Sequence, residues 1–509
     1  MVTVLETLAL LVEEKKRLSL SLDMANKYVK LAILGCIVVS LGALALERNE
    51  IQAANTNPVN DDTELLEVAD YSSYRENNAY HTVTLSSAKS AYQQLDSKKE
   101  GRANTTYVIQ SDFDLEGKTI NMPENCVLRF EGGVLRNGAV VGDNTNIEAP
   151  PRQLFATSMT LKGTWCIDQA FVEWFGARAM TKYNKTAALN NAAAIQLAAN
   201  TFQNVSFAAN SNNKAFYYVT AEKGSNWVIN IHEPVSMSGI NQVSTQIVYV
   251  GESDIPVFYL TKSDAEYVFG PRYASIQNMC IRGEDYKCRK GTAIYVENGV
   301  AHVKFENLYF CYLNECFVSD TWSVNLNTCK AEVSNVGFRM GVEHKGMPAQ
   351  NLTRCTAGYC KIAFALKSVF YSTMLNCSSD YCEVAWAIDQ CIGLTLMTIG
   401  AEHCKQFMDI KGNDTRHIKL SNAFICVYKN DEMTKEDWNN FVSVGEKVRH
   451  VVFEEVDFEM NEPKALSSLK NRDTRFIMVK GPNSQNQAFT ISNSYCSRGD
   501  VNGFIDCRK

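Results

Sequence analysis

From Tyr107 onward, hydrophobic residues come in short runs of β-branched and aromatic side chains, and glycine or asparagine separates one run from the next. Runs and breaks at this close spacing predict short strands joined by tight turns. One stretch differs, because residues 186–200 (TAALNNAAAIQLAAN) are dominated by alanine and Thr186 can cap their first turn. The pattern therefore predicts an all-β protein with one short N-terminal helix.

A repeat of 22 residues runs through the middle of this strand-rich region. Its register is marked by Cys316, Phe338, Cys360, Cys382, Cys404 and Cys426. The segments CKIAFAL, CEVAWAI and CKQFMDI are three copies of one strand, and their alternate positions are apolar. These aligned positions are Ile362/Val384/Gln406, Phe364/Trp386/Met408 and Leu366/Ile388/Ile410. Residues that recur at a fixed step in this way are expected to stack on successive strands.

This period predicts a single-stranded right-handed parallel β-helix over residues 106–509, with coils of about 22 residues stacked about 4.8 Å apart. The outward columns support the register, because their charges alternate in sign: Lys361/Glu383/Lys405 and Lys367/Asp389/Lys411. Such ladders could bind a polyanion, but self-neutralised structural ladders are favoured. The alanines between the ladders predict a shallow outer strip: Ala363, Ala385, Ala365 and Ala387.

Asparagine marks further corners upstream of the regular repeat. The fragments IQNM, FENL and VSNV recur at steps of 29 and 28 residues, which is typical of coils with longer loops. Their asparagines, Asn278, Asn307 and Asn335, are expected to turn the corners, because an amide side chain can bond the neighbouring backbone.

The N-terminal part of the chain has a different pattern of hydrophobic and charged residues. Residues 31–46 are an uncharged apolar run preceded by lysines and followed by glutamates. Residues 1–46 are therefore expected to be a signal peptide or signal anchor, with Met24 as a candidate true start, and residues 47–105 a polar lead-in. This predicts an exported protein in the periplasm, at the cell surface or outside the cell, which meets the membrane only through its N-terminal segment.

Two segments resemble a known family. Residues 112–147 and the stretch GTWCIDQAFVEWFGA (163–177) resemble secreted β-helix proteins of the pectate-lyase-like superfamily, in forms common in Bacteroides-type bacteria. Residues 178–196 lack the aspartates that the family typically shows after Trp-Phe-Gly-Ala. The resemblance implies an exported protein that faces polysaccharide, and its fold is compatible with a homotrimer. Members include lyases, hydrolases, phage tailspikes and proteins without known activity, so the chemistry must come from the site.

Composition and motifs exclude several classes of function. The chain has 509 residues and a net charge of -6, which opposes a nucleic-acid partner. It has no phosphate-binding loop and no nucleophile elbow, and its C-x4-C spacing is not that of a zinc site, so no cofactor or metal is expected.

The 17 cysteines have two interpretations. Cys355 with Cys377 and Cys360 with Cys382 could form disulfides, or the thiols could pack inside as small hydrophobes, which is favoured.

The strongest candidate for a catalytic site is a pair of carboxylates. Asp380 and Glu402 are one repeat apart and are expected to stack on adjacent coils, near the ~5–5.5 Å carboxyl separation of a retaining glycosidase. His403 adds a titratable imidazole, and Tyr359 and Tyr381 form an aromatic platform for substrate. The alternative, which is favoured, is that these acids are corner residues bonded to backbone amides.

A second candidate is the cluster around Arg416 and Lys419 in GNDTRHIKL. These cations could neutralise a uronate carboxylate and so assist a lyase. A solvated loop between coils is the favoured alternative. The sequence thus leaves two functions open: a polysaccharide hydrolase or lyase acting along the β-helix face, or a non-catalytic, tailspike-like protein that binds glycan at the cell surface or has a structural role.

Overall fold

The computed structural model describes residues 81–208, 215–262, 273–287, 289–342, 346–427, 440–460, 477–480, 489–496 and 505–508. The chain divides into two compact units, Met1–Asn77 and Asn78–Lys509, and all described residues belong to the second. The expected signal segment at 1–46, with Met24, lies outside the described residues. Among the helices that the structure describes, none is long and apolar enough to cross a membrane.

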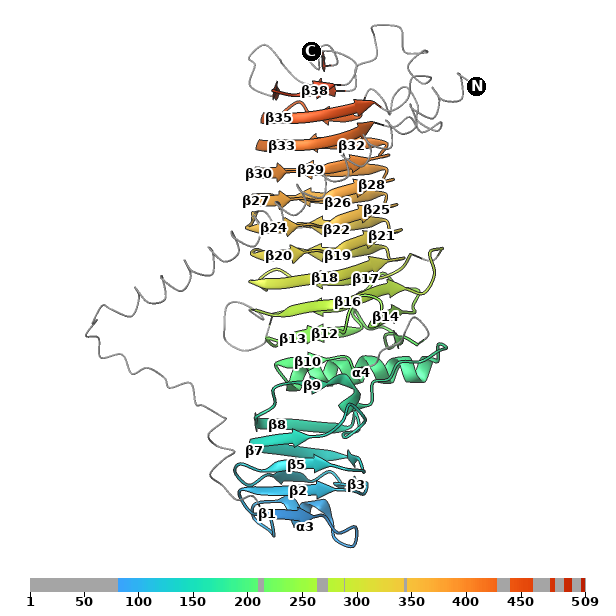
Figure 1. Ribbon diagram of the computed structural model, residues 1–509, viewed down its shortest axis with the longest axis vertical. Helices are drawn as coiled ribbons and strands as arrows, with labels where there is room; N and C mark the ends of the chain where they lie inside the picture. Colours follow the sequence, from blue (N-terminus) through green and yellow to red (C-terminus); the bar gives the residue numbers. More distant parts are fainter. Residues whose placement is uncertain are drawn as a thin grey trace, which may run out of the picture. The chain divides into compact units, whose positions relative to one another are not determined.

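The second unit is a parallel β-helix, as the repeat predicts (Figure 1). Its first coils contain β1 (His81–Thr84), α3 (Ala91–Leu95), β2 (Thr105–Ile109), β3 (Phe113–Asp114), β4 (Thr119–Asn121), β5 (Val127–Phe130), β6 (Leu135–Arg136), β7 (Gly138–Glu148) and β8 (Met159–Trp165). They are followed by β9 (Ala170–Phe171), the 3-10 turn η1 (Val172–Phe175) and α4 (Lys185–Thr201). Every pairing between named strands in the described part of the chain is parallel, for example β26 with β29 and β28 with β31.

Beyond α4 the coils build three faces. Face A holds β10 (Asn204–Ser206), β13 (Ser236–Ser238), β20 (Val324–Asn327), β23 (Met347–Pro348), β24 (Gln350–Thr353), β27 (Val369–Leu375), β30 (Ile392–Met397) and β37 (Phe489–Ser492). Face B holds β11 (Tyr217–Val219), β14 (Gln246–Tyr249), β21 (Lys330–Glu332), β25 (Thr356–Gly358), β28 (Ser378–Asp380), β31 (Gly400–Glu402) and β38 (Tyr495–Cys496). Four long strands run across both faces: β16 (Ser275–Gly283), β18 (Val303–Cys311), β33 (Arg416–Val427) and β35 (Arg449–Met460).

Face C is a sheet of eleven strands. They are β12 (Ile229–Ile231), β15 (Pro256–Leu260), β17 (Thr292–Val296), β19 (Glu315–Ser319), β22 (Val336–Met340), β26 (Ile362–Lys367), β29 (Val384–Asp389), β32 (Gln406–Lys411), β34 (Val442–Val444), β36 (Ile477–Lys480) and β39 (Ile505–Arg508). Ile362 pairs with Val384 and Val384 with Gln406, so these coils keep the step that the sequence predicts. The charge ladder Lys367–Asp389–Lys411 is also in register, as predicted.

The register predicted outside these three coils is wrong. Phe338 pairs with Phe364 rather than standing over Cys360, so this coil is longer than the repeat. Cys426 pairs with Glu402 rather than continuing the column of Cys404, so the coil that enters β33 is longer as well. The cause is variable corner length, since residues 412–415 join β32 to β33, whereas residue 368 alone joins β26 to β27.

A stack of large side chains fills the interior. The rings of Phe338 and Phe364 lie 5.2 Å apart, and those of Phe364 and Trp386 lie 4.1 Å apart with an interplanar angle of 7°. Ala363 and Ala385 are fully buried beside this stack, so the outward strip predicted for these two alanines is wrong. The ladder skips from Ile362 to Phe364, and two consecutive residues therefore point inward at this bend.

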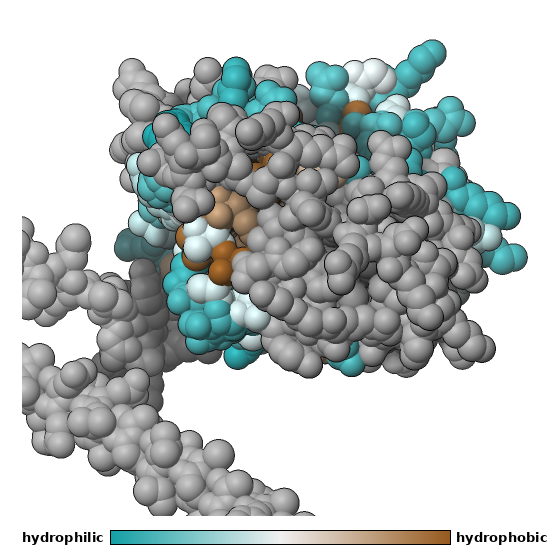
Figure 2. Space-filling model, turned by 90° about the horizontal axis from the view of Figure 1, so that it is seen from above, coloured by the Kyte–Doolittle hydropathy of each residue, from teal (hydrophilic) through white to brown (hydrophobic). Residues whose placement is uncertain are grey.

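Seen along the axis of the coils, hydrophilic residues form the visible rim and hydrophobic residues gather toward the middle (Figure 2). The first coils also bury their hydrophobic residues. They include part of the segment 47–105 that the sequence predicts as a polar lead-in, so this part is folded. β1 pairs with β2, and Leu85, Ala91 and Leu95 are buried against the first coils. These three apolar side chains thus belong to the same core as the first coils.

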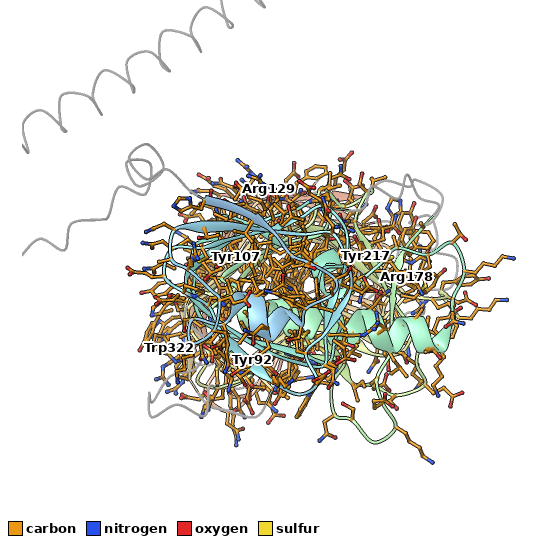
Figure 3. All side chains as sticks on the ribbon, turned by 90° about the horizontal axis from the view of Figure 1, so that it is seen from below. Tyr92, Tyr107, Arg129, Arg178, Tyr217 and Trp322 are labelled. Atoms are coloured by element: carbon orange, nitrogen blue, oxygen red, sulfur yellow. The ribbon has the colours of Figure 1, made fainter. Side chains whose placement is uncertain are left out.

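The predicted helix is present as α4, but its N-cap is Asn184 rather than Thr186. The Asn184 side chain accepts a hydrogen bond from the Ala187 amide, which caps the first turn. Figure 3 labels two buried tyrosines, Tyr107 in β2 of the first coils and Tyr217 in β11 next to α4. Tyr107 donates its hydroxyl to the Arg102 carbonyl at 3.1 Å, and Tyr217 donates to the buried Glu173 carboxylate.

Single residues with left-handed backbone make many of the corners. Asn278 and Asn307 have φ of 59° and 52°, and Asn307 Nδ2 donates to Asn278 Oδ1 at 2.9 Å, as expected for corner asparagines. Asn335 lies at a bend, but the left-handed residue of that corner is Val333. Asn335 instead donates to the Asn314 side chain at 2.8 Å.

The thirteen cysteines whose side chains the structure describes are free thiols, which is the interpretation that the sequence favours. Several follow a left-handed corner residue and point inward, for example Cys382 after Tyr381 and Cys391 after Gln390. The Cys391 thiol donates to the Asp389 and Leu366 carbonyls at 3.4 and 3.5 Å. Burial raises the pKa of the Cys391 thiol to about 12. These thiols are therefore packing residues that also bond corner carbonyls.

Candidate functional site

The site lies at the corner between faces B and C, on two adjacent coils. β28 ends at Asp380 and β31 ends at Glu402, and these two residues are direct partners in the parallel ladder. Tyr381 and His403 come next in the two coils, with φ of 51° and 55°. The carboxylates and the rings are all at least partly exposed, so they share one exposed edge of the solenoid.

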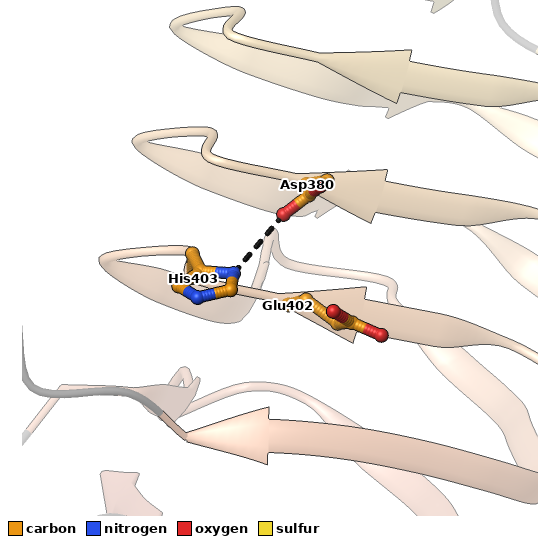
Figure 4. Close-up of side chains that lie close together, drawn as sticks. All are labelled: Asp380, Glu402 and His403. Carbon is orange, nitrogen blue, oxygen red and sulfur yellow. Dashed lines mark hydrogen bonds and ion pairs between the residues drawn. The ribbon is translucent and has the colours of Figure 1, made fainter. Parts of the chain in front are cut away.

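Asp380 and His403 are in contact across the coils (Figure 4). The His403 Nδ1 atom lies 3.3 Å from Asp380 Oδ1, and the side chains are 27% and 51% exposed for His403 and Asp380. A carboxylate at Nδ1 favours the tautomer that carries a proton there, which leaves Nε2 as the basic nitrogen. The arrangement thus supplies a histidine that is oriented and reachable from solvent.

The three aromatic rings of this corner form a continuous stack. Tyr359 and Tyr381 lie 5.0 Å apart with an interplanar angle of 1°, and Tyr381 and His403 lie 4.2 Å apart at 8°. Tyr359 and Tyr381 remain 54% and 46% exposed. All three residues adopt left-handed backbone. The stack is therefore a preformed aromatic platform beside the carboxylates, as the sequence predicts.

Three groups converge closely enough to act together. Asp380, Glu402 and His403 each offer one ligand-type atom, and these atoms all lie within 4.8 Å of one another. Since one oxygen of each carboxylate lies within this limit, the pair is compatible with the ~5–5.5 Å carboxyl separation of retaining glycosidases. Two carboxylates and an imidazole could also hold a divalent cation, which the sequence does not predict.

Arg416 and Lys419 do not belong to this group. Both lie in the first half of β33 on face A, where Arg416 pairs with Ile392 and Lys419 with Thr395. The corner residue Asn422 separates them from the face B half of the strand. The Arg416 guanidinium contacts Asp414, and Lys419 Nζ lies 2.8 Å from Glu454. The structure thus places two of the predicted substrate-binding residues on a different face from the carboxylate pair.

The same corner continues upstream, which the 22-residue repeat does not predict. Cys311, Glu332, Gly358 and Asp380 are successive ladder partners on face B. Tyr312 therefore stands in the column of Tyr359 and Tyr381, with φ of 62°. The coil from Glu332 to Gly358 is longer than the coils on either side of it, so a register with one fixed step cannot find this continuation.

No protein-family model and no curated protein matches this chain. Solved structures do resemble it. The gp42 tailspike of Acinetobacter phage vb_AbaP_AS12 is 12% identical with a TM-score of 0.44, and the match covers 65% of this chain and 57% of the tailspike. The chain thus spans little more than half the length of that tailspike.

Two further solved structures resemble the chain with lower TM-scores. The A-module of mannuronan C-5 epimerase AlgE4 from Azotobacter vinelandii is 10% identical with a TM-score of 0.36, over 67% of this chain and 98% of the module. An iota-carrageenase in complex with iota-carrageenan fragments is 8% identical with a TM-score of 0.31, over 67% of this chain and 90% of the enzyme.

Proposed function

We propose that the protein is carbohydrate-active and cleaves a polysaccharide at the corner formed by Asp380, Glu402 and His403. The observation that carries the proposal is the coincidence, on two adjacent coils, of a close carboxylate pair, an oriented imidazole and an exposed aromatic platform. Aromatic faces bind the apolar faces of sugar rings, and paired carboxylates perform glycosidic acid–base and nucleophilic chemistry.

The contacts suggest a division of roles. Asp380 shares a close contact with His403, so it has a partner with which to exchange a proton and is assigned as the general acid/base. Glu402 is the exposed carboxylate beside it and is assigned as the nucleophile. Tyr359 and Tyr381 hold the sugar chain against these groups by stacking.

A hydrolase fits this corner better than a lyase. A lyase must neutralise the carboxylate of its uronate substrate, and the cations suggested for this role, Arg416 and Lys419, lie on face A with acidic partners of their own. His403 would still serve as the base if a lyase substrate brought its own counter-charge. Glycan binding without cleavage is the second candidate, because two exposed tyrosines with parallel, stacked rings can bind sugar on their own.

The proposal is tested on a panel of neutral and acidic polysaccharides. Release of reducing ends reports cleavage, and the absorbance of unsaturated products separates a lyase from a hydrolase. The variants are Asp380→Asn and Glu402→Gln, and Asp389→Asn is the matched control because it alters an outward carboxylate in β29, on face C. Loss of activity in the site variants alone supports the proposal. Full activity in both site variants, or an inactive parent that still binds a glycan, contradicts catalysis here.

We further propose that the protein acts outside the cytoplasm. The support is the uncharged run at residues 31–46, with lysines before it and glutamates after it. Fractionation of producing cells tests this directly. Recovery of the full chain in the cytoplasmic fraction would contradict export, whereas recovery in a periplasmic, surface or extracellular fraction would support it.

A further inference from the structure

A second charged cluster lies on face A, on the adjacent strands β33 and β35. Arg416 in β33 and Arg449 in β35 are direct partners in the parallel ladder. His417 and His450 follow them, and their rings stack 4.9 Å apart at an interplanar angle of 17°. The dipeptide Arg-His therefore recurs in register on successive coils, and its four side chains line one outer edge of face A.

The charges of this cluster do not balance among its own members. Both guanidinium groups approach the same carboxylate oxygen, Asp414 Oδ1, with Arg416 Nη1 in direct contact and Arg449 Nη2 at 3.6 Å. Like charges directly opposite one another on adjacent strands destabilise a sheet, and a single shared carboxylate leaves one positive charge over. Lys419, further along the same strand, is instead paired one-to-one with Glu454.

The arrangement resembles an anion site already filled in part by the protein. Asp414 is 54% exposed and Arg449 is 55% exposed, so solvent and ligands reach the guanidinium pair. A second carboxylate or a sulfate on the open side would meet fixed N–H donors and cancel the remaining charge. The stacked imidazoles of His417 and His450 add further N–H donors beside the guanidinium pair.

We propose that Arg416, Arg449, His417 and His450 bind an anionic group, a carboxylate or a sulfate, of an acidic glycan. The whole chain has a net charge of -6, which opposes general attraction of any polyanion, so the proposed contact is confined to single anionic groups at this local cluster. The site lies on face A and does not depend on the role of Asp380 or Glu402. In this proposal Arg416 binds the glycan on face A, away from the carboxylate pair.

The first test uses inorganic sulfate as the probe. Sulfate should raise the Tm of the parent protein more than chloride does at equal ionic strength, and Arg449→Gln and Arg416→Gln should lose this difference. Arg136→Gln is the matched control, because Arg136 is an exposed arginine in β6 that also contacts two aspartates, Asp112 and Asp114. An equal effect of sulfate on the parent and on both variants overturns the site.

The second test distinguishes a free anion from a glycan. Electrophoresis through gels that contain polygalacturonate, dextran sulfate or neutral dextran measures binding without any need for cleavage. The parent should be retarded by an acidic polymer and not by dextran, and Arg449→Gln should weaken this binding roughly tenfold while Arg136→Gln does not. A sulfate effect on Tm without retardation by either acidic polymer would contradict glycan binding. Stronger retardation by DNA than by both acidic polymers would also overturn it.

Discussion

His403 Nδ1 lies 3.3 Å from Asp380 Oδ1, although the two residues belong to different coils. The contact exists because Asp380 ends one face B strand and His403 occupies the left-handed corner after the next. The same corner geometry stacks the His403 ring on Tyr381. One imidazole thus links the carboxylates to the aromatic platform, and substitutions can separate its two contacts.

Replacing His403 with phenylalanine should keep the stack and remove the contact with Asp380. We expect His403→Phe to retain the KM of the parent and to lower kcat by about 100-fold or more, because positioned proton transfer contributes on this scale. Steady-state kinetics on the best polysaccharide of the panel measures both constants. A raised KM with unchanged kcat would show that His403 serves only in binding.

Truncating Tyr381 should mainly raise KM, whereas His403→Phe should mainly lower kcat. Its ring lies between those of Tyr359 and His403, so Tyr381→Ala removes the centre of the platform. We expect KM to rise about three- to tenfold, the range of one or two aromatic contacts, while Tyr381→Phe stays near the parent. Equal losses in both variants would place the function of Tyr381 in its hydroxyl rather than in stacking.

The proposed roles of Asp380 and Glu402 do not require a bound cation. We therefore expect the activity of the protein to survive prolonged treatment with a chelator followed by assay in metal-free buffer. If activity is lost and returns on addition of a divalent cation, the three convergent groups act as its ligands rather than as acid/base and nucleophile.

Buried thiols should make the protein less stable at alkaline pH. The pKa of the Cys391 thiol is raised to about 12 by burial, whereas in the unfolded chain it is near its usual value of 9.0. Between these values the unfolded chain loses the proton and the folded chain keeps it, so the free energy of unfolding falls as pH rises. Each such thiol contributes a slope of about 1.4 kcal/mol per pH unit.

The variant Cys391→Ser isolates this contribution. A serine hydroxyl can replace the thiol at such a corner, because Ser334 at another corner donates to the Glu332 carbonyl at 2.9 Å. Urea unfolding at several alkaline pH values should give a shallower pH slope for Cys391→Ser than for the parent. Parallel slopes for the two proteins would show that the Cys391 thiol ionises alike in the folded and unfolded chains.

The sequence predicts the fold and the contents of the main corner because the three regular coils share one step. Asp380, Glu402, Tyr381 and His403 are correctly brought together by the constant spacing of these coils. Prediction fails where corner length varies. Residues 412–415 before Arg416 shift the next coil, and their effect on register depends on backbone conformation that residue types do not specify.

The burial of side chains at the bends could also not be predicted from the sequence. Strict alternation places Ala363 outside, but the chain turns after Ile362 and both Ala363 and Phe364 point inward. At two corners the left-handed residue is Val333 or Tyr359, whereas the glycine or asparagine that usually takes this conformation stands close to it, at Asn335 or Gly358. These corners are specified by the stack as a whole, through the ladders on either side of each turn.

The central claim is that the Asp380–Glu402 corner cleaves a polysaccharide, and the rate of Glu402→Gln beside that of Asp389→Asn tests it most directly. With reducing-end release as the readout, we predict that Glu402→Gln loses about a thousandfold or more of the parent rate while Asp389→Asn keeps it. Retention of the parent rate by Glu402→Gln, in a protein that still cleaves the polysaccharide, would contradict the account.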